Sequence, residues 1–198
     1  MDNKDIYNKY KKLFLEKNQT LNLISKNDEN FLEEKHIFDS LSIKLFFEKY
    51  GNHFKTLLDI GTGGGFPALP IAINYPNIEV TGIDSTTKKI NAINDIAQNL
   101  GLKNFIGIAE RVENLKNQKF DLLTSRAVAK LDLIAKYALP LMKKDSFLIV
   151  YKSKTTADEI KNSEKFLKKN KASVIDVIKY ELPLNEVYER NLVIIKYV

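Results

Sequence analysis

Four glycines lie within positions 61–65, directly between a short apolar segment and a helical pattern. Leu57 to Ile60 is typical of a buried strand, and Phe66 to Asn74 predicts a helix with prolines in its first turns. Glycine lets the backbone turn sharply and lets a ligand approach the main chain closely. This strand, loop and helix therefore predict an open α/β sheet with a ligand site at the carboxyl ends of its strands.

Strand and helix patterns alternate from residue 57 to about residue 169, which predicts a parallel sheet with helices on both faces. Further strands are expected at 80–83, 105–109, 120–124 and 147–151. The helices between them are expected to end at Gly101 and to span 130–142 and 155–169. Segments 174–180 and 192–198 are two closing strands joined by a turn, so we expect them to pair antiparallel. The predicted fold is α/β and Rossmann-like, with a mostly parallel seven-stranded sheet and an antiparallel closing strand.

Residues 1–50 carry two helical patterns ahead of the first strand. The first pattern has one apolar stripe, formed by Ile6, Tyr10, Leu13 and Phe14. In the second pattern we expect Asp28 to cap a helix that carries Phe31, Leu32, Phe38, Leu41 and Leu45. The chain is therefore expected to divide into a short helical extension, 1–50, and an α/β domain, 51–198.

Asp84 lies at the end of the second predicted strand, 23 residues after Gly61. A carboxylate in that place can accept hydrogen bonds from both hydroxyls of an adenosine ribose. Hydrogen bonds to a charged group contribute about 1.5–3 kcal/mol each. The pattern therefore favours a nucleoside cofactor over the alternative, which is a glycine-rich turn beside a solvated aspartate.

The spacing of the glycines bears on which cofactor binds. A dinucleotide fingerprint needs its third glycine where this chain has Phe66, or at Ala68 if counting begins at Gly63. Asp59, two residues before the first glycine, is more typical of S-adenosylmethionine-dependent methyltransferases. A P-loop is excluded because no Gly-Lys-Ser/Thr follows. Two alternatives stay open: an NAD-dependent reductase, and a non-catalytic module that binds S-adenosylmethionine and RNA.

Two more strand ends carry candidate site residues. Arg111, Val112 and Glu113 follow the third strand, where a loop of this fold can cover an adenine, although an ordinary surface loop is the alternative. Arg126 follows the fourth strand, where the substrate meets the methyl group in such folds, and it is one of only three arginines in the chain. Because lysine supplies nearly all the other positive charges, we interpret Arg126 as a position that needs a planar fork of donors.

His36, Asp39 and Ser40 are spaced so that they share one helix face. This spacing is equally compatible with a polar network that faces the site and with a solvated surface histidine. No serine lies on a strand-to-helix elbow with a plausible base, so a Ser/His/Asp nucleophile is not expected.

Composition narrows the remaining classes. Cysteine is absent, which excludes a disulfide scaffold, an iron–sulfur cluster and a thiol nucleophile, and with only two histidines we expect no metal site. Residues 111–198 carry 18 basic and 11 acidic side chains, a balance that suits either a phosphate-rich partner or a lysine-rich solvated surface. The first residues lack the apolar stretch of a signal peptide, and the uncharged stretch 60–78 holds too many glycines and prolines for a membrane helix. We therefore expect a cytoplasmic protein without membrane contact.

With these motifs in order, the sequence resembles the bacterial ribosomal RNA small subunit methyltransferase G family, also called glucose-inhibited division protein B. The matching segments are Asn22–Ile24, His36–Leu41, Leu58–Pro67, Asp84–Ser85, Arg111–Glu113, Ser125–Ala127, Tyr151–Lys152 and Arg190–Val193. They cover nearly the whole chain and are more specific together than the glycine loop alone. The chain departs from the family pattern at Ala68 and Ser153, where glycine is usual.

The resemblance implies a class I methyltransferase that transfers a methyl group from S-adenosylmethionine to N7 of a guanosine in 16S rRNA, position 527 in the usual ribosomal numbering. The substrate would be the 30S subunit or its precursor, and a monomer is expected. The resemblance implies cofactor contacts from Gly61, Gly63, Phe66, Asp84, Ser85, Val112, Glu113 and Arg126. Arg126 is expected to position the cofactor or the target guanine, and no general base is expected. The weaker candidates for RNA contact are His36, Lys152, Lys154 and Arg190.

Overall fold

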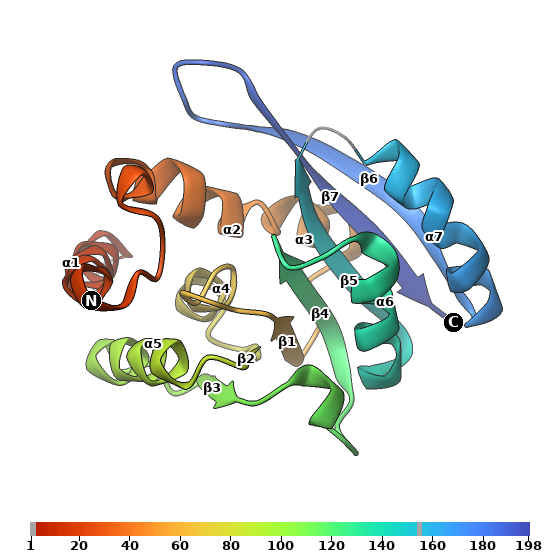
Figure 1. Cartoon of the computed structure of the whole chain (residues 1–198), viewed down its shortest axis with the longest axis horizontal. Helices are drawn as coiled ribbons and strands as arrows, with labels where there is room; N and C mark the ends of the chain where they lie inside the picture. Colours follow the sequence, from red (N-terminus) through yellow and green to blue (C-terminus); the bar gives the residue numbers. More distant parts are fainter. Residues whose placement is uncertain (1–2, 154–155) are drawn as a thin grey trace.

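The computed structural model describes residues 3–153 and 156–198 and contains one seven-stranded sheet, ordered β3-β2-β1-β4-β5-β7-β6 (Figure 1). The strands are β1 (Thr56–Ile60), β2 (Glu79–Asp84), β3 (Phe105–Ala109), β4 (Phe120–Arg126), β5 (Met142–Ser153), β6 (Ala172–Leu182) and β7 (Tyr188–Tyr197). Neighbouring strands from β3 to β5 pair in parallel, whereas β7 pairs antiparallel with both β5 and β6. The predicted sheet is therefore confirmed, including its antiparallel closing strand.

Helices cover both faces of the sheet because successive strand residues point to opposite sides. Leu58 belongs to the core beneath α6 (Leu131–Ala138) and α7 (Ala157–Lys169). Its neighbour Leu57 belongs to the core beneath α3 (Lys44–Tyr50) and α4 (Ala68–Asn74). Both leucines are fully buried. Consecutive apolar residues in the strands thus supply both faces of the sheet and produce the three-layer arrangement that the alternation of strands and helices predicted.

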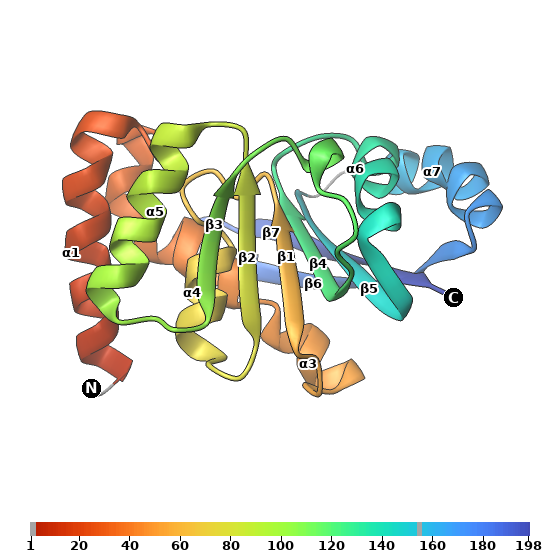
Figure 2. The ribbon, with the colours of Figure 1, turned by 90° about the horizontal axis from the view of Figure 1, so that it is seen from below.

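The N-terminal helix α1 (Asn3–Leu21) packs on α5 (Thr87–Leu100), outside the β3 edge of the sheet (Figure 2). Tyr10 and Phe14 are completely buried, in one core with Phe66 and Ile93. The apolar stripe predicted for this helix is confirmed. The division of the chain at residue 50 stays a prediction, since the extension and the sheet domain share this core.

The single helix predicted after Asp28 is wrong. The segment consists of a 3₁₀ helix (Lys26–Phe31), a π-helical stretch (Leu32–Phe38) and the short α2 (Asp39–Leu41). Asp28 caps nothing; its carboxylate instead accepts hydrogen bonds from Ser25 Oγ at 2.7 Å and from Lys35 Nζ at 2.9 Å. π-helical turns are rare and occur often at functional sites. Here the wide turn lies directly before Asp39, beside the residues described below.

The helix predicted for 130–142 is too long at its end. Helix α6 ends at Ala138, a 3₁₀ turn spans Leu139–Leu141, and β5 begins at Met142. Proline has no backbone N–H and disrupts a helix interior, so Pro140 favours this early end. Another 3₁₀ turn spans Val112–Asn114. For the helix predicted at 155–169, α7 begins at Ala157, and Thr155 lies outside the described residues.

No helix within residues 3–153 and 156–198 combines the length and the apolar character needed to cross a membrane.

Candidate active site

The glycine loop is anchored to the strand beside it. The backbone N–H groups of Gly61 and Thr62 both donate hydrogen bonds to the carbonyl of Ile83 in β2, at 2.9 and 3.0 Å. Gly61 and Gly63 have φ angles of +70° and +53°, a region that residues with a Cβ adopt at a cost. A Cβ at Gly61 would lie 2.4 Å from Cγ2 of Val128, whereas a Cβ at Gly63 would meet only a carbonyl oxygen at 3.9 Å. The backbone at Gly63 is therefore open to a ligand.

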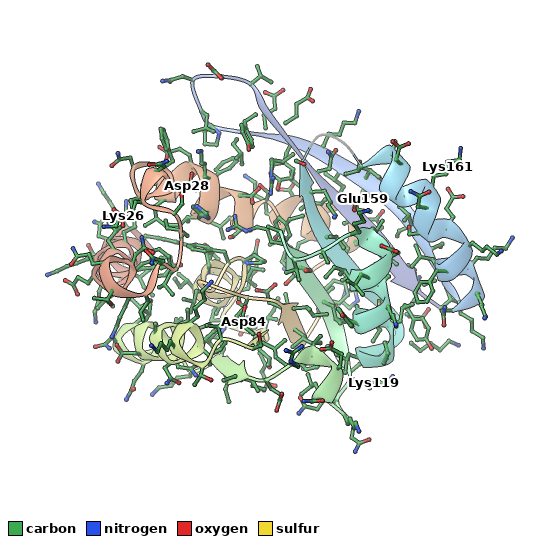
Figure 3. All side chains as sticks on the ribbon, in the orientation of Figure 1. Lys26, Asp28, Asp84, Lys119, Glu159 and Lys161 are labelled. Carbon is green, nitrogen blue, oxygen red and sulfur yellow. The ribbon has the colours of Figure 1, made fainter. Side chains whose placement is uncertain are left out.

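Asp84 lies beside this loop, as the sequence predicted from its place after the second strand (Figure 3). Its Oδ2 accepts a hydrogen bond from the Gly63 N–H at 3.0 Å, and its Oδ1 accepts one from the Thr86 N–H at 2.8 Å. Both oxygens are thus held by backbone donors. Because each carboxylate oxygen has a second lone pair, the group can still accept hydrogen bonds from a ligand's hydroxyls.

Two neighbouring cavities enclose the loop. The first, here called the glycine cavity, has a volume of about 400 Å³ and is lined by Gly61, Gly63, Phe66, Asp84, Arg126 and His36, among others. The second, here called the Glu113 cavity, has a volume of about 300 Å³ and is lined by Ser85, Val112, Glu113 and Arg111, among others. Gly61, Asp84 and Val128 line both. The structure therefore brings together all eight predicted cofactor residues around two adjoining cavities.

The glycine cavity also has walls that sequence reasoning missed. Leu23, Ile24 and Ser25, from the connection after α1, also line it. A Cβ at Gly64 would lie 2.9 Å from the carbonyl oxygen of Leu23, so this connection touches the loop directly. The family-like segment 22–24 was the available signal, although nothing in its residue types indicates a binding role. Val128, 44% exposed, belongs to the segment after the fourth strand that the sequence singled out with Arg126, but no separate role was predicted for it.

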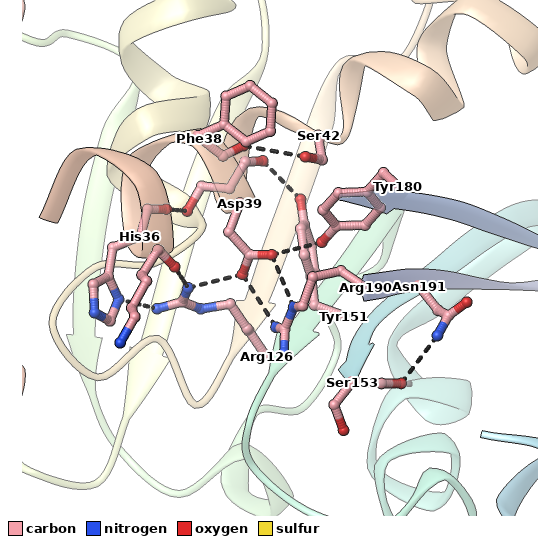
Figure 4. Close-up of polar contacts among 12 residues, drawn as sticks. His36, Phe38, Asp39, Ser42, Arg126, Tyr151, Ser153, Tyr180, Arg190 and Asn191 are labelled. Atoms are coloured by element: carbon pink, nitrogen blue, oxygen red, sulfur yellow. Dashed lines mark hydrogen bonds and ion pairs between the residues drawn. The ribbon is translucent and has the colours of Figure 1, made fainter. Parts of the chain in front are cut away.

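Arg126 extends from the end of β4 towards the N-terminal segment (Figure 4). Its Nη1 donates to Asp39 Oδ2 at 2.9 Å and to the Lys35 carbonyl at 3.1 Å, and its Nη2 lies 2.7 Å from His36 Nδ1. The guanidinium carbon also lies 5.2 Å from the centre of the Phe66 ring. A guanidinium has five N–H donors, and the described residues take three of them. The predicted polar network of His36 and Asp39 thus exists and is centred on Arg126.

The contact with Arg126 fixes the state of His36. A guanidinium has no acceptor, so His36 Nδ1 must accept and the proton of the neutral ring must be on Nε2. Burial, together with the Arg126 charge, lowers the pKa of His36 to about 4. The Nε2 atom is buried and has no hydrogen-bond partner among the described residues. His36 is therefore a neutral ring in the wall of the glycine cavity, not a cation suited to phosphate.

Asp59 is the penultimate residue of β1, just before the loop, and is fully buried. Burial raises the pKa of Asp59 to about 7, although the Thr124 hydroxyl donates a 2.8 Å hydrogen bond to its Oδ1. A carboxyl group with this pKa is partly protonated at neutral pH. It does not line either cavity.

The predicted RNA-contacting residues Lys152 and Arg190 are partly buried and take part in contacts within the protein. Lys152 Nζ lies 2.6 Å from Glu159 and donates to the Ala129 carbonyl, while Arg190 donates two hydrogen bonds to Asp39. Both residues line a third cavity of about 210 Å³, here called the Lys152 cavity, which shares Ala127 and Val128 with the glycine cavity. Their role in RNA binding stays a prediction. Lys154 lies outside the described residues.

Residues 3–192 match the family model described as rRNA small subunit methyltransferase G. The chain belongs to this family. A Clostridium botulinum (strain Eklund 17B) protein named Ribosomal RNA small subunit methyltransferase G is 37% identical over 192 residues, which cover 94% of this chain and 79% of that protein. The protein of the same name from Aster yellows witches'-broom phytoplasma is 37% identical over 175 residues, covering 86% of this chain and 82% of that protein.

A solved structure shows that the fold is similar to that of a methyltransferase. A SAM-dependent O-methyltransferase from Thermotoga maritima superposes with a TM-score of 0.59 at 12% identity, covering 81% of this chain and 65% of that one. Membership of the rRNA small subunit methyltransferase G family confirms the predicted enzyme class and the Rossmann-like methyltransferase fold. It also makes the NAD-dependent reductase alternative wrong. The individual roles assigned to site residues stay predictions.

Proposed function

We propose that this protein transfers the methyl group of S-adenosylmethionine to N7 of a guanosine in 16S rRNA, at position 527 in the usual ribosomal numbering. The observation that carries the proposal is the pair of adjoining cavities around the glycine loop, with Asp84 between them. Family membership supplies the substrate class, and the resemblance noted above supplies the N7 position. The acceptor is a 30S subunit or its precursor, and the enzyme acts as a monomer.

The residues present fit S-adenosylmethionine. The open backbone at Gly63 and the aromatic face of Phe66 suit the methionine end in the glycine cavity. Asp84 suits the ribose hydroxyls, and Val112 and Glu113 in the neighbouring cavity suit the adenine. Arg126 has two N–H groups beyond the three that the described residues accept from, and these suit the carboxylate of S-adenosylmethionine. When bound, S-adenosylmethionine supplies an electrophilic methyl group on a sulfonium.

The reaction needs alignment more than proton transfer. N7 of guanine has a lone pair and no proton, so no general base has to act before the attack. The protein must hold N7, the methyl carbon and the sulfur in line, and such alignment can supply about 7–11 kcal/mol at best. The methylated base gains positive charge, so a cation beside it would not stabilise the product. Arg126 is therefore a positioning residue, and neutral His36 adds no charge to the wall of the glycine cavity.

The test uses rRNA and 30S subunits from cells that lack this gene. Each is incubated with the protein and methyl-labelled S-adenosylmethionine, then digested, and the labelled nucleoside is identified. We expect label in 7-methylguanosine at a single site, and a strong loss of label with Arg126→Gln although that variant still unfolds cooperatively. Donor binding without any label in either substrate would contradict the proposal and favour the non-catalytic alternative. Label in another nucleoside would contradict the N7 assignment.

A further inference from the structure

One buried carboxylate connects two arginines from distant parts of the chain. Asp39, at the start of α2, is 1% exposed. Its Oδ1 accepts hydrogen bonds from Tyr180 Oη at 2.6 Å and Arg190 Nε at 3.1 Å. Its Oδ2 accepts from Arg126 Nη1 at 2.9 Å and Arg190 Nη2 at 3.2 Å (Figure 4). All four contacts come from strands β4, β6 and β7, so the carboxylate joins the N-terminal segment to the carboxyl end of the sheet and its closing hairpin.

The two arginines belong to different cavities. Arg126 lines the glycine cavity, and Arg190 lines the Lys152 cavity but not the glycine cavity. Ala127 and Val128 form a wall common to both cavities. In the proposed function the methionine end of the methyl donor occupies the glycine cavity and its adenine the Glu113 cavity, which leaves the Lys152 cavity, beyond Ala127 and Val128, available to an acceptor.

The shared carboxylate makes the two guanidinium positions depend on each other. Arg190 holds Asp39 through two parallel N–H donors, a geometry that fixes orientation as well as distance. Arg126 holds the remaining side of Oδ2. Without the carboxylate, two permanently charged groups would face each other with little solvent between them, because their side chains are only 12% and 15% exposed. A change in the contact between Asp39 and one arginine therefore shifts the position of the other arginine.

We propose that Asp39 is a positioning residue that sets Arg126 on the donor side and Arg190 on the acceptor side of the reaction as one unit. The inference rests on the proposed methyl transfer for the meaning of the two sides. Its physical content is narrower and separable: the state of Arg190, in one cavity, determines how well the other cavity binds the donor.

The first experiment compares Asp39→Asn with Asp121→Asn. Asp121 is a matched control because it also accepts four hydrogen bonds, from Lys55, Thr56 and Lys143, but at the opposite end of β4. We measure thermal unfolding, binding of S-adenosylhomocysteine by calorimetry, and the KM for 30S subunits. We expect Asp39→Asn to weaken the binding of S-adenosylhomocysteine about tenfold or more and to raise the KM for 30S subunits by a similar factor, because both arginines lose a shared charged partner. Asp121→Asn lowers the melting temperature and leaves both constants within about twofold of wild type.

The second variant, Arg190→Lys, keeps the positive charge but cannot form the two-donor grip on Asp39. It also keeps the experiment decisive if Asp39→Asn does not fold. We expect weaker binding of S-adenosylhomocysteine although Arg190 does not line the glycine cavity. Unchanged binding in Arg190→Lys, or Asp39→Asn constants that match those of Asp121→Asn, would overturn the proposal. Binding of the analogue requires no transfer, so this outcome is independent of whether rRNA proves to be the acceptor.

Discussion

At the scale of single residues, Gly64 lies close against the backbone of Leu23 in the wall of the glycine cavity. A Cβ at Gly64 would lie 2.9 Å from the Leu23 carbonyl oxygen and 3.2 Å from its Cβ. We expect Gly64→Ala to push residues 22–25 away from the loop, because neither backbone can yield locally. Overpacking of this kind costs about 1–3 kcal/mol. The same displacement opens the wall of the cavity, so affinity for S-adenosylhomocysteine falls as well, which calorimetry measures.

Gly101→Ala is the control for this prediction. Gly101 ends α5 with φ +74°, and a Cβ there would meet nothing within 4 Å. Its substitution costs about 1 kcal/mol of backbone strain in the left-handed region and affects no cavity. A Gly64→Ala protein that binds the analogue as tightly as Gly101→Ala does would show that the Leu23 contact is irrelevant to the site.

Residue-level prediction succeeded where strand ends alone determine position. Asp84 and Gly63 follow two adjacent parallel strands, so their contact was predictable from periodicity. The contacts of Asp39 with Arg126 and Arg190 were not predictable, because these arginines lie 87 and 151 positions further along the chain. Spacing placed His36 and Asp39 on one face but left a solvated histidine equally possible. Only the path of β7 beside β5 brings Arg190 back to them.

At the scale of elements, α1 supports the glycine loop through its apolar stripe. Phe14 is fully buried, and its ring centre lies 5.1 Å from that of Phe66, which lines the glycine cavity. We expect Phe14→Ala to cost about 3–5 kcal/mol of stability, as large-to-small core changes do. Because the cavity left behind lies next to Phe66, affinity for S-adenosylhomocysteine should fall too. Urea unfolding and calorimetry measure the two effects.

Phe54→Ala separates this effect from general destabilisation. Phe54 is 6% exposed and packs with Phe46 and Phe147 in the core under α3, a separate cluster that contains neither Phe14 nor Phe66. We expect a comparable loss of stability with unchanged affinity for the analogue. Equal losses of affinity in both variants would mean that α1 has no specific role in shaping the site.

The elements themselves were predictable in proportion to their periodicity. The short apolar strands and the amphipathic helices α1, α5 and α7 were found with small errors at their ends. The segment 26–41 was not, because its course depends on tertiary contacts. The side-chain oxygen of Asn18 in α1 accepts a hydrogen bond from the Ile24 N–H, and its amide nitrogen donates one to the Glu29 carboxylate. These two contacts hold the segment in a 3₁₀ helix where the sequence predicted a capped α-helix. The exposed Phe31 and Phe38 made the apolar pattern look continuous although these rings do not enter the core.

At the scale of the whole molecule, we expect positive charge at the rim of the site to matter more for RNA binding than the net charge. Lys26 follows Ser25, which lines the glycine cavity, and Lys130 follows Ala129, which lines the Lys152 cavity. Both lysines are exposed. We expect the double variant Lys26→Gln, Lys130→Gln to weaken rRNA binding and to lower the slope of log affinity against log salt. Each lost contact with a single-strand phosphate changes that slope by about 0.7. Filter binding between low and moderate salt measures it.

The control is Lys103→Gln, Lys119→Gln. These exposed lysines precede β3 and β4, at the opposite ends of the strands from the site; Figure 3 shows Lys119 and Lys26 far apart. The control removes the same charge, so it should change long-range attraction but not the phosphate contacts. If both double variants reduce the salt slope equally, RNA does not dock specifically on the rim.

The pH dependence of stability contains two opposing contributions from the site. Burial raises the pKa of Asp59 from 3.8 to about 7, so the folded protein binds a proton that the unfolded chain releases, and stability falls as pH rises between these values. Burial, with Arg126, lowers the pKa of His36 from 6.5 to about 4, so the unfolded chain binds a proton that the folded protein excludes. The His36 contribution is therefore complete above about pH 6.5 and is lost as pH falls towards 4. Between about pH 4 and 6.5 the two slopes oppose each other.

Single substitutions should expose each slope in turn. In Asp59→Asn, which keeps an acceptor for the Thr124 hydroxyl, we expect the free energy of unfolding to rise with pH across this window relative to wild type. In His36→Gln it should fall with pH relative to wild type. Each difference is bounded by about 1.4 kcal/mol per pH unit, the value for one proton. Urea unfolding at half-unit intervals from pH 4.5 to 7.5 measures both. Parallel curves for wild type and Asp59→Asn would mean that Asp59 has the same pKa in the folded and the unfolded chain. Water would then reach the Asp59 carboxyl group next to the glycine loop.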